Sequence, residues 1–318
     1  MLNPTKLYFN YGRTALDFAL KQKNFKINDE ILVPDYICSS VVKVIEKNNI
    51  KIRYYDTTIN FKPIWEKLDE YLNKNTKILL MVHYFGIPQD IQKFIQFSSN
   101  NNLILIEDNS HGFEGLHENK ILGTFGDIGI SSPRKMFSFL GGILYINNEK
   151  FKISYPKENN LKKYNPINNY KLHTSEILKT TKNKIKKYIK KRYPYENLDY
   201  FRNEEETEKN IIIFDKSIEG LISKINWKKY KFRKYKKIQK ILDLAKKNNL
   251  EPVYKNYSEE LNPWCIPFYT RSHSDSIKWF EWGWKNNFEI FSWPTLPKEL
   301  VEKEMILKRW KDLICFGL

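Results

Sequence analysis

Hydrophobic and polar positions follow two different periods over the first 150 residues. Short apolar runs with the length and composition of buried strands lie at residues 30–34, 51–55, 77–83, 103–106, 126–131 and 142–147. Before and between the first four runs, apolar residues recur every three or four positions, which predicts helices at residues 14–25, 38–47, 63–72 and 90–99. Strands and helices that alternate in this way build a mostly parallel sheet with helices on both faces, so the sequence predicts an α/β fold.

Unusual polar segments follow three of these strands. They are His83, residues 108–112 and residues 131–135. Because ligands of open parallel sheets bind beyond the carboxyl ends of the strands, we expect these segments to meet at one ligand site.

The pattern changes after residue 148, and we expect two units. Residues 1–209 would form the large domain, including a polar, Lys-rich connecting segment at 149–209, and residues 210–318 would form a smaller α+β domain. The expected elements of the smaller domain are a long Lys-rich helix at 227–245 and strands near 252–254 and 265–269.

A basic amphipathic helix is predicted at 178–192, within the connecting segment. We interpret it as a solvated helix with one apolar stripe on the core, the alternative being a helix that lies on a membrane surface.

The chain has 54 basic and 37 acidic residues, a net charge of +17. Such a charge suits nucleic acid, and Lys and Tyr interleave at 228–235, but no nucleic-acid-binding motif is present. Most of the basic residues are Lys in a chain rich in Asn and Ile, which is typical of an AT-rich coding bias. We therefore expect solvated surface lysines and no nucleic-acid partner.

Cysteine and histidine usage argues against disulfides and metals. Cys38, Cys265 and Cys315 are widely spaced, and the five His form no HExxH motif, so we expect no disulfide framework and no metal site. The chain has no run of about 18 apolar residues and no signal-peptide pattern. We therefore expect a cytoplasmic protein without a membrane span.

Three sites remain as candidates for chemistry, since neither GxGxxG nor GxxxxGK[ST] occurs. Gly12, Arg13 and Thr14 open a helix, where backbone N–H groups suit a phosphate, although the same residues could simply cap the helix. Asp108 ends an apolar strand, where a carboxylate needs a positive partner unless it caps a helix. Lys135 lies on a turn between two apolar strands, and the alternative there is a solvated cation.

Five stretches occur in a fixed order within residues 8–147: GRTALDFAL, DEILVPDYICSSVV, VHYFGIPQDI, LILIEDNSHGFEG and GDIGISSPRKMFSFLGG. Together they resemble the DegT/DnrJ/EryC1/StrS family of sugar aminotransferases, which use pyridoxal 5'-phosphate (PLP) and have fold type I. The resemblance implies a mostly parallel sheet sandwiched by helices, followed by a smaller α+β domain.

The resemblance also implies roles for individual residues around PLP. Lys135 resembles the lysine that bonds to PLP as an imine, and Asp108 the carboxylate that pairs with the pyridine nitrogen. His111 lies where members have His or Gln near the phenolic oxygen. Tyr36 or Cys38 lies where an aromatic side chain usually covers the ring, and the sequence does not choose between them.

The phosphate of PLP would be bound by two segments. Gly12, Arg13 and Thr14 match the phosphate-binding turn of the family. Ser131 or Ser132 resembles a hydroxyl residue that also reaches the phosphate.

By resemblance, the reaction would transfer an amino group from glutamate to a nucleotide-linked keto-sugar for surface polysaccharide or glycan synthesis. A homodimer is also implied. Lys135 argues against the dehydratase branch of the family, whose members have His there. Residues 139–142, FLGG, stand where the family commonly has a GEGG-like turn. The alternative is therefore a degenerate, non-catalytic relative that acts as a binding or regulatory protein.

Overall fold

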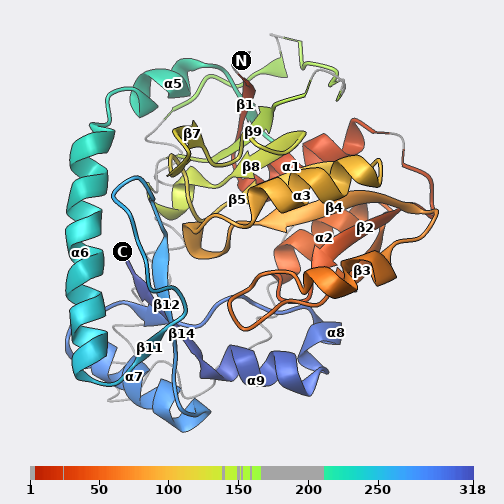
Figure 1. Ribbon diagram of the computed structural model, residues 1–318. Coiled ribbons are helices and arrows are strands. Elements are labelled where there is room, and N and C mark those ends of the chain that lie inside the picture. Colours follow the sequence, from red (N-terminus) through yellow and green to blue (C-terminus); the bar gives the residue numbers. More distant parts are fainter. Residues whose placement is uncertain are drawn as a thin grey trace, which may run out of the picture.

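The computed structural model of the chain describes residues 4–23, 25–137, 140–148, 151, 153–157, 160–165 and 211–318. The predicted helix at 178–192 lies outside these residues. Two sheets dominate the described part, and the long helix α6 (Trp227–Lys247) runs along one side of both (Figure 1).

The larger sheet has eight strands in the order β10-β1-β9-β8-β5-β4-β2-β3. Their bounds are β1 Thr5–Phe9, β2 Glu30–Pro34, β3 Lys51–Tyr55, β4 Thr76–Val82, β5 Ile104–Asn109, β8 Ile128–Ser131, β9 Gly142–Ile146 and β10 Ile213–Phe214. The five strands from β3 to β8 are parallel, and β9, β1 and β10 add an antiparallel edge. The predicted fold class is therefore confirmed. The edge strand β10 comes from beyond residue 209, where we expected the large domain to end.

Helices cover both faces of the larger sheet. Helices α1 (Gly12–Lys21) and α2 (Ser39–Lys47) pack on one face, and α3 (Ile91–Asn100) packs on the other. In β2, Ile31 and Val33 face the α1/α2 core while Leu32 between them faces α3, as the two-residue period of a strand requires. The continuous apolar run in the sequence therefore reflects burial on both faces.

The C-terminal region, residues 211–318, contains the smaller sheet, in the order β11-β12-β14-β13. Its strands are β11 Glu251–Pro252, β12 Cys265–Tyr269, β13 Ile290–Phe291 and β14 Leu313–Gly317, and its other helices are α5 Ser217–Ile222, α7 His273–Lys285, α8 Lys298–Val301 and α9 Glu304–Asp312. Residues of this region, among them Cys265 and Trp310, join the same core as α1 and α2. No helix within the described ranges is both long and apolar enough to cross a membrane.

Short elements complete the fold: the 3₁₀ turns η1 (Trp65–Tyr71), η2 (Tyr84–Gly86) and η3 (Pro133–Lys135) and the β6 (Leu116–His117) and β7 (Lys120–Ile121) hairpin. The predicted α-helix at 63–72 is thus a 3₁₀ helix, and Leu68 is its one fully buried residue, too few for an amphipathic α-helix. The predicted strand at 103–106 extends to Asn109 because the polar side chains at its end have buried partners.

Candidate functional site

A cavity lies beyond the carboxyl ends of the parallel strands, as the strand pattern predicted. Its volume is about 80 Å³, and it is partly open to solvent. Seven predicted site residues line it, namely Gly12, Arg13, Cys38, Asp108, His111, Ser132 and Lys135. The structure therefore brings the carboxylate of Asp108, from β5, and the amine of Lys135, from the turn after β8, into one cavity.

Lys135 reaches the cavity from η3, the turn that directly follows β8. Its backbone N–H donates to the carbonyl of Ser132 at 3.0 Å, and Pro133 begins the turn. Burial lowers the pKa of the Lys135 amine to about 8, although Cys38 and Asp108 act in the opposite direction. A substantial fraction of this amine is therefore neutral near pH 8, which a nucleophile or a base requires.

Asp108 lies near the end of β5 and is almost fully buried. Its Oδ1 accepts a hydrogen bond from the Ser110 backbone N–H at 2.8 Å, so it closes a turn and does not cap a helix. Burial raises the pKa of the carboxyl, and the hydrogen bonds from Ser110 and the charge of Lys135 only partly offset this. A cation placed next to Asp108 would gain from a poorly solvated carboxylate.

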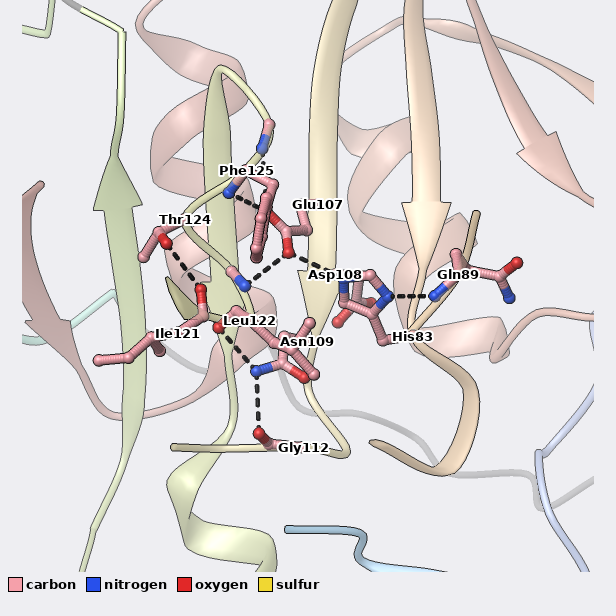
Figure 2. A network of polar contacts seen from close by, with 12 residues as sticks. His83, Gln89, Glu107, Asp108, Asn109, Gly112, Ile121, Leu122, Thr124 and Phe125 are labelled. Atoms are coloured by element: carbon pink, nitrogen blue, oxygen red, sulfur yellow. Dashed lines mark hydrogen bonds and ion pairs between the residues drawn. The ribbon is translucent and has the colours of Figure 1, made fainter. Parts of the chain in front are cut away.

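Glu107 precedes Asp108 and points to the opposite face of β5, where it forms a buried network (Figure 2). Its carboxylate accepts hydrogen bonds from the backbone N–H groups of Gly123, Phe125 and Gly126 at 2.6, 2.6 and 2.9 Å. His83 Nε2 lies 2.8 Å from Glu107 Oε1, while its Nδ1 accepts from the Gln89 N–H at 3.1 Å, which places the proton on Nε2. Although burial opposes ionisation, these donors hold the pKa of Glu107 below its usual value.

His111 contributes a neutral imidazole to the cavity. Its Nδ1 accepts the Phe85 backbone N–H at 3.1 Å, so the ring proton lies on Nε2. Burial lowers the pKa of His111 well below its usual value, and the charge of Lys135 acts in the same direction. Trp264 and Trp293 pack on the ring, with centroids at 5.0 and 4.6 Å. The imidazole can therefore donate a hydrogen bond through Nε2 without carrying a charge.

Gly12 leaves room for a ligand at the first turn of α1. A Cβ atom there would lie 3.3 Å from the Ser131 carbonyl oxygen, 3.3 Å from Ser132 Cβ and 3.6 Å from Ser110 Oγ. The absent side chain thus forms a cradle beside three serine residues at a helix N-terminus, an arrangement that suits a phosphate. The residues present therefore fit the phosphate of PLP.

Two arginines add positive charge near this cradle. The guanidinium carbons of Arg13 and Arg134 lie 4.8 and 4.9 Å from the centroid of the Tyr11 ring, and all three residues line the cavity. The cavity therefore favours an anionic ligand.

Thr14 and Ser131, both predicted to reach the phosphate, lie outside the cavity lining. The hydroxyl of Thr14 is 2.7 Å from Asn10 Oδ1 and accepts the Tyr11 backbone N–H at 3.1 Å, so it caps α1. The hydroxyl of Ser131 donates to the Asn109 carbonyl at 3.1 Å. Of the two serines left open by the sequence, Ser132 is the one that lines the cavity.

The structure also distinguishes Tyr36 from Cys38, the two residues expected at the position of the aromatic side chain that covers the PLP ring. Tyr36 is fully buried beside the cavity and donates its hydroxyl to the Trp293 carbonyl at 2.8 Å. Cys38 lines the cavity instead. Trp264 lies near both Lys135 and His111, Trp293 packs on His111, and Phe85 also stacks on His111, with centroids 6.0 Å apart.

Sequence reasoning missed these tryptophans as site residues, together with Tyr11, Ser110 and Arg134. Ser110 and Arg134 lie inside recognised stretches, so proximity to Asp108 and Lys135 could have indicated them. Nothing in the sequence around Trp264 pointed to the cavity. No group of three or more potential metal ligands occurs in the part of the chain that the structure describes.

Residues 6–155 match the model of the DegT/DnrJ/EryC1/StrS aminotransferase family. GDP-perosamine synthase of Escherichia coli O157:H7 is 28% identical over 134 residues, which are 41% of this chain and 34% of that protein. GDP-4-keto-6-deoxy-D-mannose 3-dehydratase of Escherichia coli O55:H7 is 30% identical over 116 residues, 36% of this chain and 30% of that protein. The matches thus span about a third of the length of these curated relatives.

Solved structures resemble nearly the whole chain in fold. The putative sugar aminotransferase Spr1654 from Streptococcus pneumoniae, apo-form, has a TM-score of 0.69 at 14% identity, covering 99% of this chain and 81% of that one. Helicobacter pylori PseC, described as an aminotransferase involved in the biosynthesis of pseudoaminic acid, has a TM-score of 0.63 at 12% identity, covering 98% of this chain and 81% of that one. Residues 6–155 therefore carry the sequence pattern of the DegT/DnrJ/EryC1/StrS aminotransferase family, and the chain as a whole has the fold of solved sugar aminotransferases.

Proposed function

We propose that this protein is a PLP-dependent aminotransferase. The observation that carries the proposal is the shared cavity, in which the Lys135 amine and the Asp108 carboxylate lie with the Gly12 cradle. In this assignment Lys135 bonds to the cofactor, Asp108 pairs with its pyridine nitrogen, and Gly12, Arg13 and Ser132 hold its phosphate.

The cofactor supplies an electron sink for a carbanion at the carbon that carries nitrogen. The residues of the chain supply the remaining functions. Asp108 stabilises a protonated nitrogen, because pairing with a cation offsets the cost of a buried carboxylate. Lys135, with its pKa lowered to about 8, accepts and returns a proton at Nζ near neutral pH. His111 donates a hydrogen bond from Nε2 and would so orient the phenolic oxygen of the cofactor.

We propose a nucleotide-linked keto-sugar as amino acceptor and glutamate as amino donor. Relatives named GDP-perosamine synthase and dTDP-3-amino-3,6-dideoxy-alpha-D-galactopyranose transaminase support the acceptor class. A relative named spore coat polysaccharide biosynthesis protein SpsC supports a role in polysaccharide synthesis. Arg13 and Arg134 provide charge suited to an anionic substrate. We also propose a homodimer, which light scattering tests directly.

The decisive experiment adds PLP to the purified protein, reduces the mixture with borohydride and locates the adduct by peptide mapping. We expect a single adduct at Lys135 and none in Lys135→Arg, whose guanidinium is not nucleophilic at this pH. Lys240→Arg on the exposed face of α6 is the matched control and keeps the adduct. An adduct on a different lysine, or none, refutes the assignment.

Glutamate then separates catalysis from mere cofactor binding. We expect it to convert bound PLP to the amine form, which borohydride no longer fixes on Lys135. An adduct that persists with every amino donor would favour the non-catalytic relative, in which the altered turn after Lys135 has removed the activity.

A further inference from the structure

A short segment of the C-terminal region is fastened to the site. We call residues 260–264 the strap. Three hydrogen bonds join it to residues 111–116, from Trp264 N–H to the His111 carbonyl at 2.9 Å, from Leu116 N–H to the Glu260 carbonyl at 3.0 Å, and from Asn262 Nδ2 to the Phe113 carbonyl at 2.6 Å. The strap therefore follows the turn that carries His111.

Lys234 holds the strap from the other side. This lysine on α6 is only 7% exposed, and its Nζ donates to Asn262 Oδ1 at 2.7 Å and to the Pro263 carbonyl at 3.0 Å. Burial lowers the pKa of Lys234 to about 7. A buried amine is costly, and here both of these acceptors belong to the strap. The contact thus fixes the strap against α6.

The strap ends on Trp264, whose indole lies over the reactive amine. Lys135 Nζ is 4.5 Å from the ring centroid, within the range of a cation–π contact. The indole also contacts two further rings, His111 at 5.0 Å and Phe291 at 4.9 Å. It therefore lies between aromatic groups beside Lys135.

We propose that Trp264 is a positioning residue for Lys135, and that Lys234 keeps it in place through the strap. The proposal deepens the proposed function, because it assigns a resting place to the amine whenever it is not bonded to the cofactor. On the indole face, the amine stays inside the cavity and beside His111.

The contact has a measurable consequence for protonation, since a cation–π contact stabilises the ammonium form. The other groups that act on the Lys135 amine come from several elements: Cys38 before α2, Asp108 of β5, His111 after it, Arg134 of η3 and Cys265 of β12. Replacing Trp264 removes none of these groups. A changed pH profile of Lys135 in such a variant therefore reports the indole contact.

The test uses the full-length protein without PLP, so it does not depend on the proposed function. Brief acetylation with limiting acetic anhydride labels neutral amines, and peptide mass spectrometry follows the label on Lys135 against pH. Trp264→Leu keeps the site apolar and removes the π face, so we expect the midpoint to fall by about half to one pH unit. Trp264→Phe should retain most of the wild-type midpoint. An unchanged or raised midpoint in Trp264→Leu overturns the proposal.

A second measurement tests Lys234. In Lys234→Met, two buried acceptors lose their donor, so we expect at least about tenfold faster hydrogen–deuterium exchange in a peptide covering the strap. Lys234→Arg, which keeps a donor, should restore much of the protection, and the exposed Lys240→Met on the same helix should change nothing. If the strap peptide of Lys234→Met exchanges at the wild-type rate, the role of Lys234 in holding the strap is overturned. If wild-type Lys135 forms no adduct with PLP, the proposed function fails, whereas both measurements here still decide the positioning role.

Discussion

At the scale of single residues, the site depends on how burial changes two charges. The same desolvation lowers the pKa of the Lys135 amine and raises that of the Asp108 carboxyl, so each group becomes easier to neutralise. Their mutual attraction opposes both changes. The balance leaves an amine that is reactive near neutral pH and a carboxylate that favours a cationic partner.

The first prediction concerns the pH dependence of PLP addition. Because only the neutral amine attacks, and the pKa of Lys135 is about 8, the initial rate of adduct formation should rise from pH 6.5 and level off above about pH 9. Stopped-flow absorbance measures this rate. An ordinary exposed lysine would still be gaining reactivity at pH 10, and that result would contradict the assigned environment.

Asp108→Asn gives the second prediction. The amide has the same size and can keep the hydrogen bond from the Ser110 N–H, but it carries no charge to stabilise a protonated pyridine nitrogen. We expect PLP to add at Lys135 still, and its conversion by glutamate to slow at least about 100-fold. Rapid-scan absorbance separates the two steps. Equal conversion rates in variant and wild type would remove Asp108 from the proposed chemistry.

At the scale of elements, Glu107 joins the strands that deliver these residues. Its carboxylate accepts hydrogen bonds from the turn at 123–126, which leads into β8 and so to Lys135. The same carboxylate contacts His83, which directly follows β4 (Figure 2). Asp108, which lines the cavity, and Glu107, which joins the strands, are thus neighbours in sequence on opposite faces of β5.

The third prediction follows from this network. Glu107→Gln places an amide nitrogen among N–H donors, and at least one buried donor loses its acceptor. The free energy of unfolding at neutral pH should fall by about 3 kcal/mol or more, as urea denaturation would measure. Glu118→Gln on the exposed β6–β7 turn is the control and should change it little.

The sign of the pH dependence provides a check on the same variant. The pKa of Glu107 is lower in the folded protein than its usual value of about 4.3. The ionised carboxylate therefore adds to the free energy of unfolding above that pH, and this stabilisation is lost as the pH falls. Wild-type stability should therefore decline on acidification below about pH 4.5 more steeply than that of Glu107→Gln. Parallel curves would contradict the role of the buried charge.

At the scale of the whole molecule, the smaller sheet and its helices lie below the larger sheet in Figure 1. The C-terminal region contributes Trp293 to the lining of the cavity. One fastening lies at Arg309 of α9, which donates to the Thr57 hydroxyl at 2.8 Å and to the Thr57 carbonyl at 3.1 Å. Its guanidinium also lies 3.9 Å from the buried carboxylate of Asp35, which follows β2. The two sheets are thus tied close to the start of α2 and the cavity.

Arg309→Met is the fourth prediction. Burial already raises the pKa of Asp35, and removing the nearby charge leaves that carboxylate without its cation. We expect a loss of about 3 kcal/mol in the free energy of unfolding, measured by urea denaturation. Arg271→Met serves as control, because the side chain of Arg271 is 86% exposed and its pairing with Asp275 is superficial. If the free energy of unfolding falls no more than in the control, the contact of Arg309 with Thr57 and Asp35 does not stabilise the fold.

Much of the fold could be predicted because local patterns carry it. The strands at 30–34 and 51–55 match the structure residue for residue. The first is a fully buried apolar run between turns, and the second is a partly exposed strand at the edge of the sheet. Strands β1 and β14 were missed, because their character depends on partners distant in the sequence. The polar end of β5 was missed because its hydrogen bonds come from other segments.

The sequence by itself determined the order of strands and helices and the residues at the carboxyl ends of the strands, because these depend on neighbours within a few positions. It therefore indicated Lys135, Asp108 and the Gly12 turn. Tertiary structure decided which neighbouring side chain faces the cavity, Ser132 over Ser131 and Cys38 over Tyr36. It also brought Trp264 to Lys135, because only the packing of the C-terminal region joins groups more than a hundred residues apart.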